Sequence, residues 1–135
     1  MNEKIGLLII DHGSRKQGAN EVVIEIASLV HKMSNSLIVQ HAHMELATPT
    51  IQQAFDRFVE AGVHNIIVQP YFLGPGKHST SDIPKMVGEI AQKHPKISVQ
   101  IGAPLGVHHK MAELVLERVR EADRLEFLST TVSKS

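Results

Sequence analysis

Four short runs of β-branched and aliphatic residues recur along the chain, and a longer amphipathic stretch follows each of them. The apolar runs cover residues 5–10, 37–40, 66–69 and 97–101, and the second run extends toward residue 44. The stretches with apolar side chains at helical spacing cover residues 19–33, 49–61, 83–93 and 108–122. This alternation predicts an α/β fold with a four-stranded, mostly parallel sheet flanked by helices on both faces. Strands that are apolar throughout are typical of a sheet covered on both sides.

Local signals mark several element ends. Gly62 follows the second helical stretch, Pro84 falls in the first turn of the third, and Asp82 is expected to cap that turn. The apolar stripes of all four helices, the last one included, are expected to form the core. We expect one domain over residues 1–125 and a flexible Ser/Thr-rich tail over residues 126–135.

Composition removes several classes of function. The 135 residues include 14 basic and 14 acidic side chains, so a net charge of zero gives no basis for binding nucleic acid or an anionic membrane. No apolar run approaches the ~18 residues of a membrane span, and no signal peptide is recognisable, so a cytoplasmic protein is expected. The absence of cysteine excludes disulfides, thiolate zinc sites and iron–sulfur clusters. The unusual feature is the nine histidines.

Histidines and a glutamate follow three of the predicted strands. In open parallel sheets, ligands bind beyond the carboxyl ends of the strands, where the strand order reverses. A sheet ordered 2-1-3-4 would bring His12 and His78 to one crevice, with Glu45 on the neighbouring strand. Two imidazoles and one carboxylate suit a borderline divalent metal such as iron, cobalt, nickel or zinc.

Two further residues flank this crevice. His43 alternates with His41 and Glu45 in an extended segment, so all three could share one face. His43 then either joins the site or only orients Glu45. Asp11 is expected mainly to fix the backbone of the first loop.

Four motifs at the strand ends carry a resemblance to a known family. They are Asp-His-Gly-Ser-Arg at 11–15, Ala-His-Met-Glu-Leu-Ala-x-Pro at 42–49, Pro-x-Phe-Leu-x-Pro-Gly-x-His at 70–78 and Ala-Pro-Leu-Gly at 103–106. In this order they resemble the small sirohydrochlorin chelatases, class II chelatases of siroheme and cobalamin synthesis. The resemblance runs over residues 5–122.

The resemblance implies ATP-independent insertion of a divalent metal into sirohydrochlorin, a tetrapyrrole rich in carboxylates. Iron is favoured and cobalt comes next, and the metal is a substrate, so no further cofactor is expected. The family's metal-binding and catalytic residues carry over onto His12, His78 and Glu45. Longer members look like two fused copies of a flavodoxin-like half unit, so a homodimer is expected of this chain.

Cationic and hydroxyl side chains near the motifs are candidates for holding the substrate carboxylates. These candidates are Ser14, Arg15, Lys77, Ser79 and Thr80. The alternative for each is a solvated loop charge or a hydroxyl that only precedes a helix.

Two other functions compete with the chelatase. The same histidines could carry metal or tetrapyrrole without catalysing insertion, and turnover separates a carrier from an enzyme. The first loop could instead handle phosphate, although no Walker loop and no G-x-G-x-x-G motif follows any strand.

Overall fold

The computed structural model describes residues 4–76 and 81–124 of the chain. Its four strands are β1 (Ile5–Asp11), β2 (Leu37–His43), β3 (Asn65–Pro70) and β4 (Ser98–Ile101). They form one sheet in the order β2-β1-β3-β4, and every pairing is parallel. The α/β class and the favoured strand order are thus confirmed. The order reverses at β1, so the switch point lies between β1 and β3.

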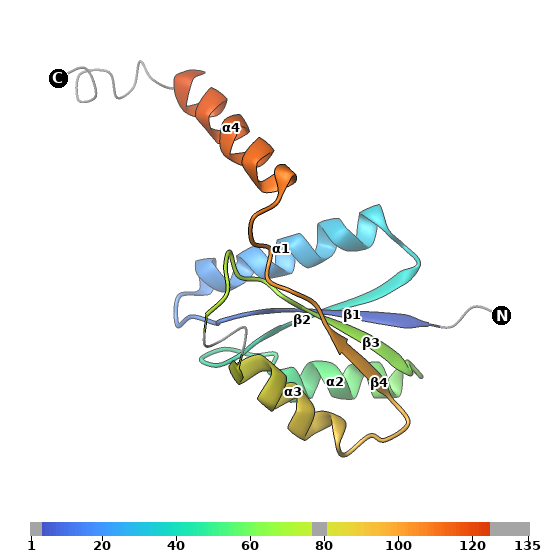
Figure 1. Ribbon diagram of the computed structural model, residues 1–135. Helices are drawn as coiled ribbons and strands as arrows, with labels where there is room; N and C mark the ends of the chain where they lie inside the picture. Colours follow the sequence, from blue (N-terminus) through green and yellow to red (C-terminus); the bar gives the residue numbers. More distant parts are fainter. Residues whose placement is uncertain (1–3, 77–80, 125–135) are drawn as a thin grey trace.

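The helices are α1 (Gln17–Met33), α2 (Ile51–Glu60), α3 (Ile83–Ala91) and α4 (His109–Arg124). Figure 1 shows α1 on one face of the sheet and α2 and α3 on the other. This division follows from right-handed crossovers, because the connection from β1 to β2 runs one way across the sheet and the next two run the other way. Helices therefore flank both faces, as predicted.

Two hydrophobic clusters hold these layers together. The larger lies between the sheet and α2 and α3, and it contains Leu8, Phe55 and Ile66. The smaller lies under α1 and contains Ile9 and Val23. Neighbouring residues of β1 thus enter different clusters, as the two-residue period of a strand requires.

The predicted helix ends are confirmed in part. Thr50 and Gln53 form a capping box at the start of α2, and Gly62 follows that helix at φ +74°. Pro84 lies in the first turn of α3. The predicted capping role of Asp82 is wrong, because this residue is itself in helical conformation and its side chain does not cap the helix.

The expectation that the apolar stripe of the last helix is core is also wrong. No residue of α4 is buried, and Leu114, Val115 and Val119 are 40%, 61% and 57% exposed. In Figure 1, α4 extends away from the sheet. An amphipathic pattern shows which side of a helix is apolar, but not which surface covers that side.

Two further expectations concern membrane spans and the C-terminal tail. No helix in the described part of the chain has the length and apolarity to cross a bilayer. The tail predicted for residues 126–135 lies outside the described residues.

Candidate active site

The segments that follow β1 and β2 stay paired beyond the strands. Asp11 and His43 are register partners at the ends of the two strands. The Met44 N–H then donates to the Asp11 carbonyl at 3.0 Å. One residue further on, the Glu45 N–H donates to the His12 carbonyl at 3.2 Å. The backbone itself therefore brings Glu45 beside His12, at the carboxyl edge where the sequence placed both.

His12 and Glu45 form an accessible pair. The Nε2 atom of His12 lies 3.3 Å from Oε2 of Glu45, and the side chains are 40% and 56% exposed. The His12 Nδ1 atom lies 3.2 Å from the Gly13 carbonyl oxygen. Because a carbonyl oxygen only accepts hydrogen bonds, Nδ1 carries the proton of this contact. In the neutral imidazole the Nε2 lone pair and the carboxylate then converge on one point, which suits a proton or a divalent cation.

Asp11 and His43 form a second, enclosed pair. The Nδ1 atom of His43 lies 2.6 Å from Oδ1 of Asp11, and His43 is only 1% exposed. A buried imidazole bonded to a carboxylate is held in one orientation and is poorly placed to exchange ligands with solvent. Of the two roles left open for His43, its burial favours positioning.

His41 extends this group along β2. The His41 and His43 rings meet edge to face, with centroids 5.9 Å apart. Burial lowers the pKa of His41 below its ordinary value, and the neighbouring His43 and Arg57 lower it further, whereas Asp11 raises it. The two histidines share a face, as the alternation suggested, while Glu45 lies beyond the strand and pairs with His12.

Two unusual backbone conformations fix the course of the chain next to His12 and Glu45. Gly13 has φ +94°, and a Cβ atom at this position would overlap the Glu45 carbonyl oxygen. Leu46, directly after Glu45, has φ +69°, which is uncommon for a residue other than glycine. The sequence reasoning did not single out either residue, although a glycine next to His12 was an available signal.

Asn20, from the first turn of α1, holds the loop between β1 and α1. Its Oδ1 accepts the Ser14 N–H at 2.9 Å, and its Nδ2 donates to the Ser14 carbonyl at 2.8 Å. The Lys16 N–H donates to the Ser14 hydroxyl at 3.0 Å. These N–H groups are engaged within the loop, which speaks against a phosphate cradle, since such a cradle aims its N–H groups at the ligand. Arg15 is exposed at the same loop. Asn20 was not among the predicted residues.

Several predicted site residues cannot be placed. Lys77, His78, Ser79 and Thr80 lie outside the described residues. Over residues 4–76 and 81–124, no three His, Cys, Asp or Glu side chains form a group that could hold a metal ion. Of the predicted ligand set, the described part of the chain contains His12 and Glu45.

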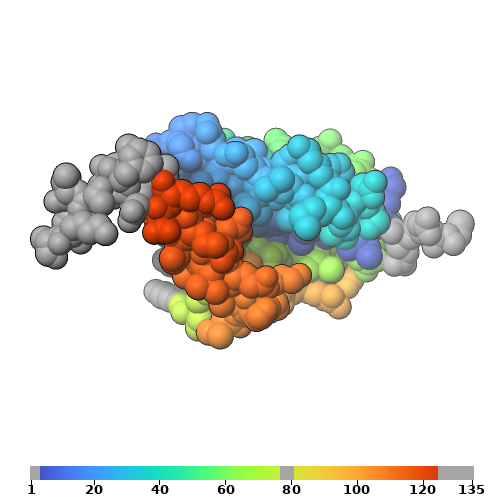
Figure 2. Space-filling view, turned by 90° about the horizontal axis from the view of Figure 1, so that it is seen from above, coloured from blue at the N-terminus to red at the C-terminus, as the bar shows by residue number. Residues whose placement is uncertain are grey.

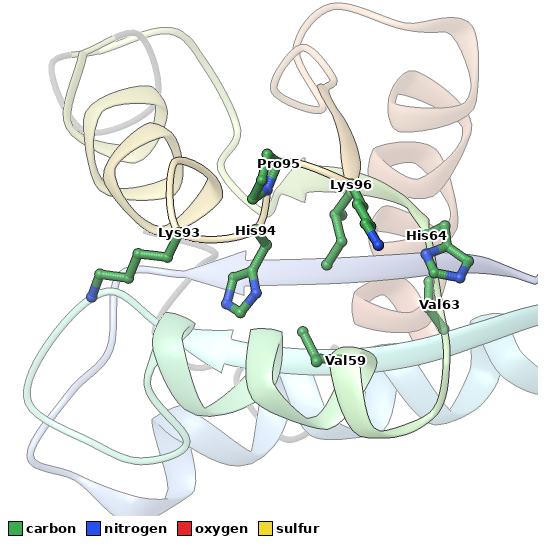
Figure 3. Close-up of a pocket in the computed structure, with 8 residues that line it drawn as sticks. Val59, Val63, His64, Lys93, His94, Pro95 and Lys96 are labelled. Atoms are coloured by element: carbon green, nitrogen blue, oxygen red, sulfur yellow. The ribbon is translucent and has the colours of Figure 1, made fainter.

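Two cavities lie at opposite ends of the sheet. One of about 290 Å³ borders the site, where Met44 and Glu45 face Lys85 and Met86 of α3. The other, of about 300 Å³, is formed by residues just before β3 and β4, including His64 and Lys96 (Figure 3). It therefore lies at the amino ends of the strands, away from His12 and Glu45.

Fold and site together define the class of protein. The fully parallel α/β unit has the doubly wound architecture, in which ligands ordinarily bind at the carboxyl edge of the sheet, and this chain has an accessible histidine–carboxylate pair at that edge. A profile of the CbiX family matches residues 6–122. The chain belongs to the CbiX family.

Three similar proteins show how the chain relates to others. It is 38% identical to the chloroplastic sirohydrochlorin ferrochelatase of Arabidopsis thaliana over 85% of this chain and 51% of that protein. It is 40% identical to the sirohydrochlorin cobaltochelatase of Methanococcoides burtonii over 90% of this chain and 98% of that protein. The cobalt complex of the sirohydrochlorin chelatase SirB from Bacillus subtilis subspecies spizizenii superposes with a TM-score of 0.82 at 26% identity, over 87% of this chain and 50% of that one. The chain thus spans about half the length of the plant and bacillar relatives.

Proposed function

We propose that this protein is a sirohydrochlorin chelatase, which inserts a divalent metal into sirohydrochlorin without ATP. Membership of the CbiX family and the names of the similar proteins, both ferrochelatase and cobaltochelatase, support the reaction class. Fe²⁺ is the favoured metal and Co²⁺ the next, although intrinsic affinity rises from iron through cobalt to nickel and supply decides the ion used.

The observation that carries the proposal is the 3.3 Å approach of His12 Nε2 to Glu45 Oε2 at an exposed edge. Insertion requires that the ion leave its protein ligands and that two pyrrole N–H protons depart. A neutral imidazole can hold the ion without adding charge and can accept a proton, and a carboxylate attracts the cation. We assign His12, Glu45 and His78 to these tasks, with Asp11 and His43 as positioning residues.

The carboxylates of the substrate need cationic and hydroxyl partners. Arg15 is exposed in the loop that follows β1, within the same motif as His12, so it supports this assignment. Lys77, Ser79 and Thr80 are proposed for the same task from the motif after β3. Ser14 uses its hydroxyl to accept the Lys16 N–H, and its O–H remains able to donate to a carboxylate. A cytoplasmic location and the independence from ATP, nucleic acid and membranes remain predictions.

The test is anaerobic absorbance spectroscopy of sirohydrochlorin with catalytic amounts of protein and Fe²⁺, Co²⁺ or Ni²⁺ in turn. We expect many turnovers above the uncatalysed rate and at least a tenfold loss in His12→Ala and in Glu45→Gln. His31→Ala is the matched control, because His31 is exposed on α1 and remote in sequence from the motifs. A spectral change that stops at one equivalent of sirohydrochlorin per protein chain would instead identify a metal or tetrapyrrole carrier.

A further inference from the structure

Leu46, directly after Glu45, combines two features that the fold does not require. Its backbone is left-handed at φ +69°, and its side chain is 53% exposed. Glycine and asparagine adopt this conformation at little cost, whereas leucine is strained there. A single exposed leucine is ordinary on a protein surface. A strained leucine beside the His12–Glu45 pair is not ordinary, because such outliers gather where a protein contacts its ligands.

A second apolar group lies further along the same edge of the sheet. Leu73, in the segment after β3, is 73% exposed, and Val107, in the segment after β4, is fully exposed. The Gly106 N–H donates to the Leu73 carbonyl at 2.8 Å, which joins the two segments. Figure 2 shows light-green atoms of the segment after β3 beside the orange segment that precedes α4. Because Val107 directly follows Gly106, it lies next to Leu73.

The histidine–carboxylate pair lies between these two apolar groups. On one side, the segment that contains Leu46 is paired with the segment after β1 through the hydrogen bond from Glu45 to His12. On the other side, the Tyr71 N–H donates to a carbonyl of β1 at 2.7 Å, two residues before Leu73. Neighbouring strands are about 4.8 Å apart, so β2 and β3 lie roughly 10 Å apart across β1. This separation is close to the width of a tetrapyrrole ring.

We propose that Leu46, Leu73 and Val107, which we call the apolar rim, hold the flat face of the sirohydrochlorin macrocycle over His12 and Glu45. This inference rests on the proposed function. The carboxylates of sirohydrochlorin lie on side chains at the periphery of the ring, whereas the face of the ring is apolar around its central nitrogen atoms. Apolar side chains on both sides of the metal ligands bind this face by removing it from water. They thereby hold the central nitrogens near the ion that is to be inserted.

Titration of metal-free sirohydrochlorin with protein, followed by absorbance under anaerobic conditions, measures this contact directly. We expect Leu46→Asn to raise the Kd roughly tenfold, because contact of a leucine with an apolar surface is worth about one power of ten in affinity. Asparagine tolerates the left-handed backbone. Val59→Asn is the matched control, because Val59 is an exposed apolar residue that borders the cavity at the amino ends of the strands (Figure 3). This control should bind sirohydrochlorin like the native chain.

Steady-state kinetics with Co²⁺ separate the apolar rim from the charged parts of the site. In Leu46→Asn and in Leu73→Asn, the loss of kcat/KM should come mainly from a higher KM for sirohydrochlorin. This rise in KM should be the same at low and at high salt, because salt does not screen an apolar contact. The effect of Arg15→Gln, which removes a partner for a substrate carboxylate, should instead become smaller as salt is added.

Leu46→Gly separates contact with the substrate from support of the fold. Glycine relieves the left-handed strain, so the midpoint of urea denaturation should be unchanged or higher than in the native chain. The Kd for sirohydrochlorin should nevertheless rise as in Leu46→Asn. A residue that only supported the fold would lose stability and binding together, and that result would refute the proposed contact.

The outcomes distinguish this inference from the proposed function. A native chain that inserts metal, with Leu46→Asn and Leu46→Gly matching its Kd and KM, overturns the apolar rim and leaves the chelatase intact. A native chain that neither binds sirohydrochlorin nor inserts metal overturns both. Variants of Leu46 that bind sirohydrochlorin normally but bind Co²⁺ more weakly would show that the residue acts on the metal ligands, and this also refutes the rim.

Discussion

Gly13 couples the backbone of the first loop to that of the segment after β2. The Glu45 carbonyl occupies the position that a side chain on Gly13 would need, and the backbone there is left-handed. The distance between His12 and Glu45 therefore depends on a residue that has no functional group. This is a packing constraint between two backbones, so no chemical motif reveals it.

Gly13→Ala is expected to lower the free energy of unfolding by about 1–3 kcal/mol, the usual cost of forcing a residue into a sparsely populated conformation. The rate of metal insertion by the same variant should fall at least tenfold, because relief of the overlap moves Glu45 away from His12. Chemical denaturation and the absorbance assay measure the two effects. Gly18→Ala is the control, since Gly18 lies in α1 with open space around it, and alanine there is expected to be neutral or stabilising.

His41 should make stability depend on pH. Its native pKa lies below the ordinary value, so on acidification the unfolded chain takes up this proton first. The contribution of His41 is therefore fully present above about pH 6.5 and is lost as the pH falls toward the native pKa. Urea denaturation between about pH 7.5 and 5.5 should show a smaller loss of stability for His41→Gln than for the native chain. His31→Gln should follow the native profile, and an unchanged profile in His41→Gln would contradict the expectation.

The positions of four candidate site residues could be predicted in advance, and the residues that hold them in place could not. His12, Glu45, Asp11 and His43 were accessible to prediction because polar residues directly after apolar strands must meet at one edge of a parallel sheet. Asn20 could not be identified in this way. Its role depends on how the first turn of α1 is oriented relative to the preceding loop, which the sequence does not show. A polar residue in a first helical turn is ordinarily just solvated.

At the scale of elements, α1 and the loop before it behave as one unit. The side chain of Asn20 makes both hydrogen bonds with the Ser14 backbone that a neighbouring strand would make. The residue is 4% exposed, so the bonds form away from solvent, where unpaired groups are costly. The loop that contains His12 is thereby attached to the helix that follows it.

Asn20→Ala should remove this attachment and leave the Ser14 N–H and carbonyl without their partner. The expected loss is about 1–3 kcal/mol in the free energy of unfolding. Asn35→Ala, at an exposed position between α1 and β2, is the matched control and should change stability by less than about 0.5 kcal/mol. Equal stability of the two variants in chemical denaturation would show that the hydrogen bonds to Ser14 contribute nothing.

Element order and type were predictable from periodicity alone, because each run is short and bounded by glycine, proline or polar residues. Two misjudgements had separate physical causes. Asp82 does not cap α3 because the backbone at this residue is already helical, and capping depends on the conformation of the residue as well as its type. The apolar side of α4 was assigned to the core because periodicity contains no information about the covering surface.

At the scale of the whole molecule, the homodimer that the family resemblance implies would make stability a property of two chains. The midpoint of thermal unfolding should then rise with protein concentration, since association favours the folded state by mass action. Differential scanning calorimetry over a hundredfold range of concentration makes the comparison, and a constant midpoint for the native chain would contradict it.

The separation of α4 from the sheet has a consequence for the order of folding events. The sheet, α1, α2 and α3 share two clusters to which α4 contributes no residue, so these elements can reach their native arrangement before α4 finds its place. If the chain forms the expected homodimer, refolding should therefore proceed in a first-order phase, followed by a second-order phase in which two nearly complete chains meet. The lifetime of the intermediate between these phases would be set by the concentration of the chain, and the apolar side of α4 would be exposed to other proteins for that time.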